Sequence, residues 1–278
     1  MSFNSVNTNR QAVYALQSLN LTNSELGGVQ KRVSTGFRVA DARDDGGAFA
    51  VAQAVRSDVA GVTAVGEQLG GTRGILSTTF ASLSVVSDTM KQLRAVLTRL
   101  ADGAVTGDSR AQYNEQYALL NEQIGNFIDD AYYNGRTLLS TVALDGGGDI
   151  TSIRNETGED FTIEAVNGED LKMTTLGPLL IATDAAALIV AGGEFSDIDA
   201  NISTALNKFG AQMQFVENQI VYNSKKIDAM NDGLGALVDA DLAKESSKLQ
   251  ALQTRQQLGV QTLGLANQGP QVLLSLFR

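Results

Sequence analysis

The 278-residue chain contains no cysteine, no histidine and no tryptophan, and only two prolines. Without thiol and imidazole side chains, the usual zinc sites and the Ser-His-Asp and Cys-His catalytic arrangements are excluded. The sequence also lacks the GxSxG and GxxxxGKS/T strings of hydrolases and phosphate-binding loops. We therefore expect a protein that is not an enzyme and that needs no cofactor and no metal ion.

Acidic residues outnumber basic ones: the chain has 31 Asp and Glu and 21 Lys and Arg, which gives a formal net charge of −10. Nucleic acid needs a basic surface, so we expect no nucleic-acid partner. The first residues lack the charged and apolar regions of a cleavable secretion signal, and no later segment is apolar for the roughly 18 residues of a membrane-spanning helix. These absences favour a cytoplasmic protein without a membrane partner, unless a dedicated apparatus exports the chain.

Two long heptad series dominate what is present. The first predicts one helix from about Asp44 to about Ala101, roughly 90 Å long at about 1.5 Å per residue, with Asp44 and Asp45 at its N-cap. The second contains one polar interruption, Asn223, which in an apolar seam typically fixes the register; a binding role for Asn223 is the alternative. The series are Val55, Val62, Leu69, Leu76, Leu83, Met90 and Leu97, and then Phe209, Met213, Val216, Ile220, Ile227, Met230, Leu234 and Leu237.

Shorter amphipathic helices complete the helical part of the chain. Residues 1–36 carry apolar residues at heptad spacing, and a similar stripe runs through the C-terminal segment. Between them, a helix from Asp108 to near Asn134-Gly135 is expected to fold back antiparallel onto the long helix.

Residues 138–195 have a different character. Phe161, Ile163 and Ala165 alternate with polar residues, and Asn167-Gly168 is typical of a hairpin turn. The expected fold class is therefore mainly α: an elongated antiparallel helical bundle or coiled coil, with its terminal helices paired and a small β-rich insert at the far end. The molecule should be a rod.

The paired terminal helices should also drive assembly. A seam of only two helices leaves apolar surface exposed, which is marginal in water, so we expect a homopolymer that buries this surface between copies. The residues expected to make these contacts belong to the apolar stripes and lack cover within the chain: Leu16, Leu19, Leu26, Val33, Leu249, Leu252, Leu263, Leu273, Leu274 and Leu276.

Three separated motifs carry a family resemblance. STGFRVADARDD at residues 34–45, followed by GGAFAVA, is similar to the N-terminal signature of bacterial flagellins. YNGRTLL at residues 133–139 resembles the turn after the third helix of that family, and the ending LANQGPQVLLSLFR resembles the flagellin C-terminus throughout. The whole is similar to short flagellins of the alphaproteobacterial type. The signature residues are Ser34, Gly36, Arg38, Asp44, Asp45, Asn134, Gly135, Asn267, Gln268, Pro270 and Gln271.

The resemblance implies a structural subunit that polymerises into the bacterial flagellar filament for swimming, is exported by the flagellar type III apparatus and is extracellular. It implies an inner coiled-coil domain of residues 1–40 and 237–278, a rod-like helical domain of residues 41–140 and 195–236, and an outer insert of residues 141–194. Expected partners are further copies of the chain, flagellar junction and cap proteins, and a secretion chaperone at the apolar C-terminal segment. A hook-filament junction protein is the alternative, and a cytoplasmic coiled-coil scaffold is a more distant one.

Two departures from the family pattern carry expectations of their own. Gly46 and Gly47 stand where many members have alanine, which should weaken the first turn of the long helix by about 1 kcal/mol per glycine. Enteric flagellins carry two Arg and a Glu in the helical motif that a vertebrate Toll-like receptor senses. That motif aligns with MKQLRAVLTR, where this chain keeps Arg94 but has Gln92 and Ala95 at the other positions. The resemblance therefore implies a poor ligand for this receptor.

Acidic and hydroxyl residues raise three further possibilities: acid catalysis, calcium binding and O-glycosylation. Adjacent helical carboxylates such as Asp129 and Asp130 point in different directions, so they are more typical of a solvated helix end than of an acid catalyst. The acidic residues of the insert lack the spacing of a calcium-binding loop; they are Glu159, Asp160, Glu169 and Asp170. O-glycosylation of Ser and Thr residues in the insert stays open.

Overall fold

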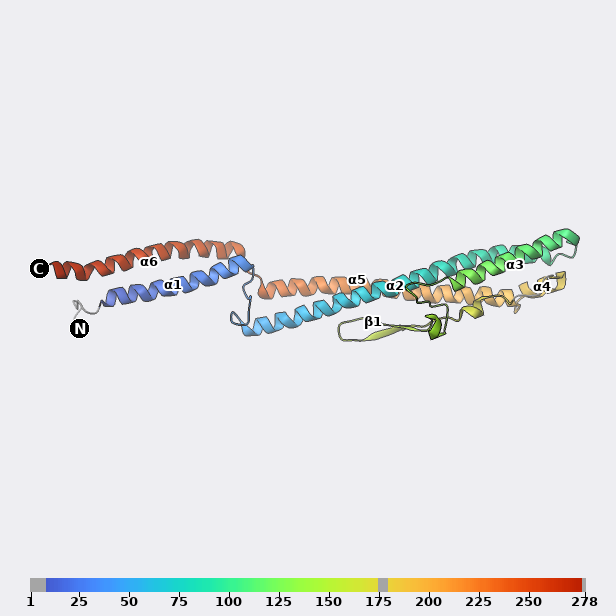
Figure 1. Ribbon diagram of the computed structural model, residues 1–278, viewed down its shortest axis with the longest axis horizontal. Helices are drawn as coiled ribbons and strands as arrows, with labels where there is room; N and C mark the ends of the chain where they lie inside the picture. The colour runs from blue at the N-terminus through green and yellow to red at the C-terminus, as the bar shows by residue number, and fades with distance from the viewer. Residues whose placement is uncertain (1–8, 175–179, 277–278) are drawn as a thin grey trace. The chain divides into compact units, whose positions relative to one another are not determined.

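The computed structural model describes the backbone of residues 9–174 and 180–276, and the side chains of these ranges up to residue 268. The mainly α fold class is confirmed (Figure 1). In the described ranges, no helix is both long enough and apolar enough to cross a membrane. The elements in chain order are α1 (Arg10–Thr35), α2 (Gly46–Leu100), α3 (Gly107–Asp129), the 3₁₀ turn η1 (Ala143–Asp145), β1 (Ile150–Ile153), β2 (Asp160–Ile163), the 3₁₀ turn η2 (Gly168–Leu171), α4 (Ala182–Ile189), α5 (Glu194–Val238) and α6 (Leu242–Leu276).

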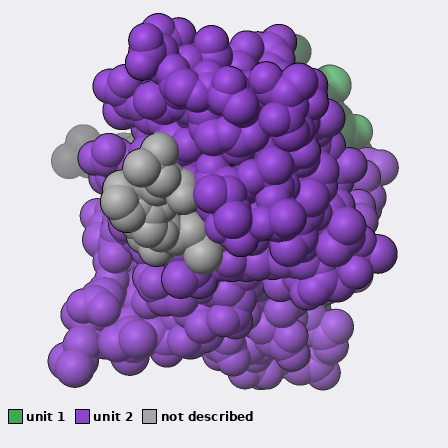
Figure 2. Space-filling model, turned by 90° about the vertical axis from the view of Figure 1, so that its right-hand side faces the viewer, with its two compact units in different colours: residues 1–57, 229–278 green, residues 58–228 purple. Residues whose placement is uncertain are grey.

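The chain forms two compact units (Figure 2). Unit 1 consists of residues 1–57 and 229–278, and unit 2 consists of residues 58–228. The long helices α2 and α5 each contribute one end to unit 1 and the rest to unit 2. Each unit has hydrophobic clusters of its own.

Unit 1 is built on the pairing of α1 with α6, which confirms the expected contact between terminal helices (Figure 1). Buried Leu26, Val29 and Leu252 form the centre of this pair, and Val33 and Leu249 pack beside them. The two helices run antiparallel, because residue numbers on α6 fall as those on α1 rise. The polar contacts are Asn9 Nδ2 to Ala266 O at 2.7 Å, Gln256 Nε2 to Asn23 Oδ1 at 2.8 Å, and Arg32 Nε to Glu245 Oε2 at 3.2 Å.

The ends of the first two helices follow local sequence signals. At the end of α1, Gly36 adopts the left-handed conformation with φ 75°, where a side chain would be strained. α2 begins at Gly46, and Asp45 Oδ1 accepts from the backbone N of Gly47 and Ala48 at 3.1 and 3.0 Å. Of the two predicted N-cap carboxylates, Asp45 is therefore the cap, whereas Asp44 turns to another partner.

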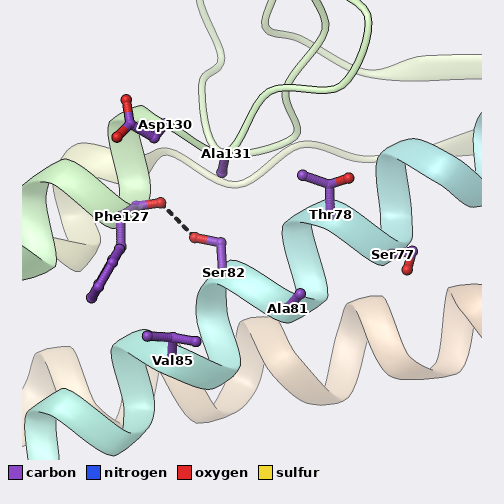
Figure 3. A pocket seen from close by; sticks show the side chains of 8 residues that line it. All are labelled: Ser77, Thr78, Ala81, Ser82, Val85, Phe127, Asp130 and Ala131. Carbon is purple, nitrogen blue, oxygen red and sulfur yellow. Dashed lines mark hydrogen bonds between the residues drawn. The ribbon is translucent and has the colours of Figure 1, made fainter.

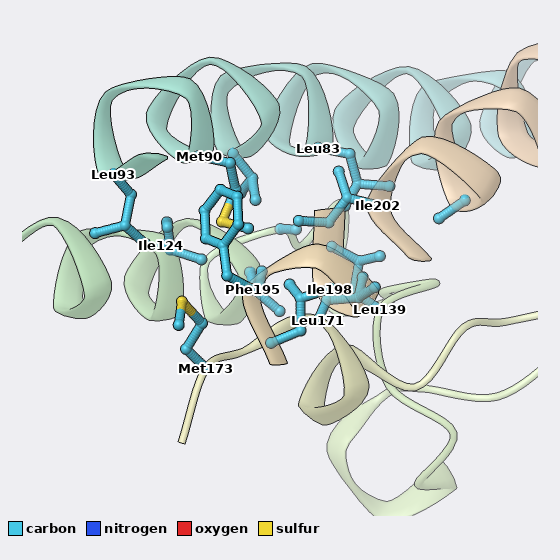
Figure 4. Close-up of a cluster of buried hydrophobic side chains, with 14 of the residues drawn as sticks. Leu83, Met90, Leu93, Ile124, Leu139, Leu171, Met173, Phe195, Ile198 and Ile202 are labelled. Carbon is cyan, nitrogen blue, oxygen red and sulfur yellow. The ribbon is translucent and has the colours of Figure 1, made fainter. Parts of the chain in front are cut away.

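The core of unit 2 rests on the α2 heptad series. Figure 4 shows side chains of α2, α3, α5 and the insert gathered into this core. The heptad residues from Val62 to Leu97 are buried, and Val55, in unit 1, is half-buried. In the second series Phe209 and Val216 are buried, but Leu237 is exposed and its neighbour Val238 is buried in its place. The series therefore loses its register at the end of α5, where the helix stops.

α3 lies antiparallel along α2, as the sequence predicts. Ser82 Oγ donates to Phe127 O, and the guanidinium carbon of Arg99 lies 5.6 Å from the ring centroid of Tyr113. The predicted end of α3 near Asn134-Gly135 is wrong, because the helix stops at Asp129.

A separate two-residue turn follows α3 and accounts for its early end. Tyr133 and Arg136 exchange two backbone hydrogen bonds, of 2.9 and 3.0 Å. Between them Asn134 and Gly135 have φ values of 50° and 74°, the left-handed pair that Asn-Gly favours in tight hairpin turns. The Asn-Gly pair thus closes its own loop and does not cap the helix.

The insert contains less β-structure than expected. Strands β1 and β2 pair antiparallel over four residues each, and Ala165 lies beyond β2. Asn167-Gly168 is not a hairpin turn, because Asn167 Oδ1 accepts from Glu169 N and begins η2. Gly168 is buried, and its amide donates to Leu139 O at 3.0 Å, which draws the chain toward the core instead of reversing it. The short helix α4, also within the insert, has no counterpart in the sequence prediction.

Polar contacts hold the β1–β2 hairpin on the long helices. Asn223 of α5, only 3% exposed, donates through Nδ2 to Arg154 O at 3.3 Å and accepts from Gln219 Nε2 at 3.1 Å. Ser152 of β1 meets Thr72 of α2 in a buried hydroxyl pair at 3.2 Å. The polar interruption in the second series therefore satisfies a backbone carbonyl of the insert, which heptad spacing alone does not reveal.

Candidate functional site

The helix pair of unit 1 leaves large apolar side chains uncovered. On α1, Val13, Tyr14, Leu16 and Leu21 are between 48 and 69% exposed. Three of them, Val13, Leu16 and Leu21, line a shallow groove of about 390 Å³ whose lining residues all belong to α1. Exposed apolar side chains on the part of α6 beyond Gln257 include Leu258, Val260 and Leu265. We call these seven residues the outer face.

The residues predicted to join neighbouring copies differ in how far they are buried within the single chain. Leu26 and Leu252 are buried within the α1–α6 pair, and Val33 and Leu249 pack against them, so the premise that they lack cover within the chain is wrong. Leu19 and Leu263 are half-buried, and Leu16 is exposed. Leu273, Leu274 and Leu276 lie outside the described side chains. Heptad spacing selected the stripe that the two helices bury against each other.

The sequence prediction missed most of the outer face. Val13, Tyr14 and Leu21 lie off the heptad stripe of α1, on the surface that a simple amphipathic helix would present to water. The sequence could have revealed them, because α1 has more large apolar residues than its single heptad stripe contains. Such residues indicate a helix with two contact faces rather than one.

The N-terminal signature residues lie where the α1–α2 and α5–α6 connections meet. Ala240 N donates to Gly36 O at 2.9 Å, and Arg38 N donates to Val238 O at 2.7 Å. The Arg38 guanidinium also donates to Leu237 O. These bonds join segments about two hundred residues apart in sequence. They fix the α1–α2 and α5–α6 connections to each other. Ser34 is exposed nearby.

Lys31 forms an ionic centre for the first connection. Its Nζ lies 2.9 Å from Asp41 Oδ2 and 2.8 Å from Asp44 Oδ2. Asp44 Oδ2 also accepts from the backbone N of Ala40 and Asp41 at 3.0 and 3.2 Å. Hydrogen bonds from Lys31 lower the pKa of both carboxyl groups, and the pKa of Lys31 is raised in return. Asp44, the first of the two signature aspartates, therefore holds α1 to the start of α2.

Unit 2 carries a second groove, between α2 and the end of α3 (Figure 3). It has a volume of about 460 Å³, is mainly apolar and opens widely to solvent. Ser82 reaches across it to bond Phe127 O, and Asp130 stands at its rim. The lining residues are Ser77, Thr78, Ala81, Ser82, Val85, Phe127, Asp130 and Ala131. A groove with this lining has no nucleophile and base in contact.

The acidic candidates behave as surface groups. Asp129 accepts from Lys172 Nζ at 2.7 Å, and Asp130 is exposed. Across residues 9–174 and 180–276, no group of three or more acidic side chains is placed to hold a metal ion. Burial raises the pKa of Tyr117 to about 12, so this phenol stays protonated at neutral pH.

The three positions aligned with the innate-receptor motif lie on the exposed surface of α2. Gln92 and Ala95 face solvent. Arg94 is also exposed, but its guanidinium lies 3.4 Å from Asp199 Oδ2 and 5.1 Å from the ring centroid of Phe195. A ligand for Arg94 would therefore compete with partners on α5.

The C-terminal signature is only partly described. Asn267 and Gln268 are exposed on α6. Pro270 and Gln271 lie within the helical backbone of α6, but their side chains are outside the described ones.

Comparison with known proteins points in one direction. Residues 6–143 match the model of the bacterial flagellin N-terminal helical region, and residues 196–277 match that of the bacterial flagellin C-terminal helical region. Flagellin FljK of Caulobacter vibrioides is 34% identical over 285 residues, with 100% of each chain covered. A flagellin of Brucella melitensis biotype 1 is 31% identical over 290 residues, with 99% of each covered. The crystal structure of Bacillus cereus flagellin aligns with a TM-score of 0.36 and 18% identity, over 66% of this chain and 94% of that one.

Proposed function

Because the chain belongs to the bacterial flagellin family, and is therefore a structural, non-enzymatic subunit that polymerises into the flagellar filament, we propose that the outer face of α1 and α6 joins it to neighbouring copies. The observation that carries this proposal is the exposure of Val13, Tyr14, Leu16 and Leu21 on a helix whose other side is already buried. Water-exposed clusters of this kind mark interaction sites.

The energetics support the same assignment. Burial of one large apolar side chain contributes about 1.5 to 3 kcal/mol, and the outer face offers seven such residues. Ordering and docking a subunit costs several kcal/mol, so the whole face and not one residue is needed. The α1–α6 cluster of Leu26, Val29 and Leu252 has the separate task of holding the two helices together.

A matched pair of variants tests the outer face. Leu16→Asp places a charge in the groove of α1, and Gln30→Asp places the same charge at an exposed polar position of the same helix. We expect Leu16→Asp to raise the subunit concentration needed for filament growth by at least about tenfold, because each 1.4 kcal/mol changes an equilibrium constant tenfold. Gln30→Asp should grow filaments normally, as seen by electron microscopy and sedimentation. Equal growth of both variants would contradict the proposal.

The finer domain roles follow from the family resemblance. We propose that residues 1–40 and 237–278 form the inner coiled-coil domain of the filament and residues 41–140 with 195–236 its rod-like domain, with 141–194 outermost. The joined connections at Gly36 and Val238 lie close to these limits, which supports the division. Truncation after Gly259 removes part of the inner domain and should abolish filament growth.

We further propose that the chain reaches the cell exterior through the flagellar type III apparatus, where junction and cap proteins meet the filament ends. Before export, a secretion chaperone would cover the C-terminal segment, because Leu258, Val260 and Leu265 are exposed on α6. Pull-down of the full chain and of a chain lacking residues 240–278 tests this point. Equal recovery of a chaperone with both chains would contradict it.

A further inference from the structure

The chain contains two Asn-Gly pairs in very different surroundings. Asn134 and Gly135 are both exposed in the two-residue turn after α3. Within the described ranges, the amide nitrogen of Gly135 donates to no backbone or side-chain acceptor. A Cβ built on Gly135 would meet nothing within 4 Å, so space is open on that side of the residue, while its carbonyl oxygen lies close to Gly146. We propose that Asn134 is a site of spontaneous deamidation, and that Asn167 is protected from the same reaction.

The chemistry needs only the chain and water. The backbone nitrogen of Gly135 gives its proton to water or hydroxide and attacks the side-chain carbonyl carbon of Asn134. The new carbon–nitrogen bond closes a five-membered succinimide, and the bond to the side-chain nitrogen breaks, so that ammonia leaves. Water then opens either carbonyl of the ring, which gives aspartate or isoaspartate at position 134. Glycine at the following position favours this attack because it has no side chain to crowd the nitrogen.

The surface position of the turn lets it reach this state by local opening. Only the two hydrogen bonds between Tyr133 and Arg136 close the loop, and the loop lies at the surface. The Asn134 side chain is exposed, and the backbone of the turn must also leave its left-handed conformation for Gly135 N to meet the side-chain carbonyl carbon, which is a local opening of this surface loop. A solvated amide also exchanges its proton readily, which the attack requires.

Asn167-Gly168 lacks each of these features. The Gly168 amide donates to Leu139 O at 3.0 Å, so its lone pair and proton are not free for the reaction. Gly168 is buried, and a Cβ there would lie 2.4 Å from Leu139 O and 2.8 Å from Ile128 Cγ2. The side-chain Oδ1 of Asn167 accepts from Glu169 N at 3.3 Å. Reaction at Asn167 therefore requires local unfolding of η2 from the core.

The product at position 134 changes the local structure. It adds a negative charge, and isoaspartate inserts an extra carbon into the main chain of a two-residue turn. The paired bonds of Tyr133 and Arg136 cannot keep their register across this longer link. Tyr133 is affected next, because its ring packs so closely on α2 that a Cβ on Gly74 would lie 2.7 Å from Tyr133 Cζ. Deamidation should therefore loosen the contact between this turn and α2.

Peptide mapping of the aged protein tests the proposal. The purified full chain is incubated in mildly alkaline buffer at physiological temperature, digested, and its peptides are analysed for the mass increase and the isoaspartate of deamidation. We expect position 134 to react at least about tenfold faster than position 167 in the folded protein, and the two rates to converge in denaturant. Hydrogen exchange at the Arg136 amide should rise in step with isoaspartate at position 134.

Matched variants provide the controls. Asn134→Gln should abolish the fast conversion, and Asn167→Gln should leave it unchanged. Equal rates at both positions of the folded protein would overturn the proposal. So would a folded protein in which position 134 stays intact while the denatured chain reacts there.

Discussion

Because α6 has both buried and exposed leucines, we predict that truncating one of each kind has different effects on the stability of the α1–α6 pair. Leu252 is 3% exposed and packs in one cluster with Leu26 and Val29, whereas Leu265 is 68% exposed. Removing a buried leucine side chain costs about 2 to 5 kcal/mol, since the apolar contact is lost and a cavity remains. The cluster is small, with three buried members, so we expect the cost of Leu252→Ala to lie at the lower end, near about 2 to 3 kcal/mol, as the helices can close part of the gap.

Amide hydrogen exchange of the monomer measures this loss. A cost of about 2 to 3 kcal/mol in local opening should lower the protection of slow amides in α1 and α6 by about 30- to 150-fold. The slow amides of unit 2 should not change, because its core is separate from this cluster. Leu265→Ala is the matched control and should leave protection in α1 and α6 unchanged. The reasoning is refuted if both variants behave alike, or if wild-type α1 and α6 have no slow amides.

Further predictions concern charge. Hydrogen bonds from Lys31 lower the pKa of Asp41 and Asp44 below the ordinary value of 3.8, so the stability they contribute is present above that value and is lost as pH falls through the lowered pKa. Circular dichroism between about pH 5 and about pH 2 should show less acid sensitivity in Lys31→Met than in the wild type. Unit 2 holds 11 Lys and Arg against 23 Asp and Glu, while unit 1 holds 10 against 8. Because neighbouring copies of unit 2 repel each other, filament growth followed by light scattering should accelerate as salt shortens the Debye length from about 30 Å to about 8 Å; slower growth would count against this. Finally, the wild type should activate the Toll-like receptor of reporter cells only weakly. The Gln92→Arg, Ala95→Glu double variant should activate the receptor at about a hundredfold lower protein concentration, since charged hydrogen bonds contribute about 1.5 to 3 kcal/mol each. A wild-type response equal to that of an enteric flagellin would argue against it.

Periodicity predicted the helical framework well, for a physical reason. Residues that recur every seven positions from Val62 to Leu97 must share one face of a helix, and burial of that face decides the packing. The cap at Asp45 was also readable, because short-range hydrogen bonding determines it. The mainly α fold class therefore follows from local chemistry.

Contacts between distant segments could not be read in the same way. Asn167-Gly168 has the sequence of a hairpin turn, but a hydrogen bond to Leu139 O directs it into the core. Asn223 interrupts a seam because it bonds a carbonyl of the insert, and this pairing leaves no periodic trace. Leu26 and Leu252 follow the same pattern as a subunit contact would, so only the fold shows that they contact each other.

Cryo-electron microscopy of filaments grown from the purified chain tests the central claim most directly, because it shows what covers the outer face. The account predicts that Val13, Tyr14, Leu16 and Leu21, exposed in the single chain, are buried against α1 or α6 of neighbouring copies. It also predicts that Leu26 and Leu252 remain in contact within one chain. A filament in which the outer face stays open to solvent while Leu26 and Leu252 separate to contact different copies would contradict it.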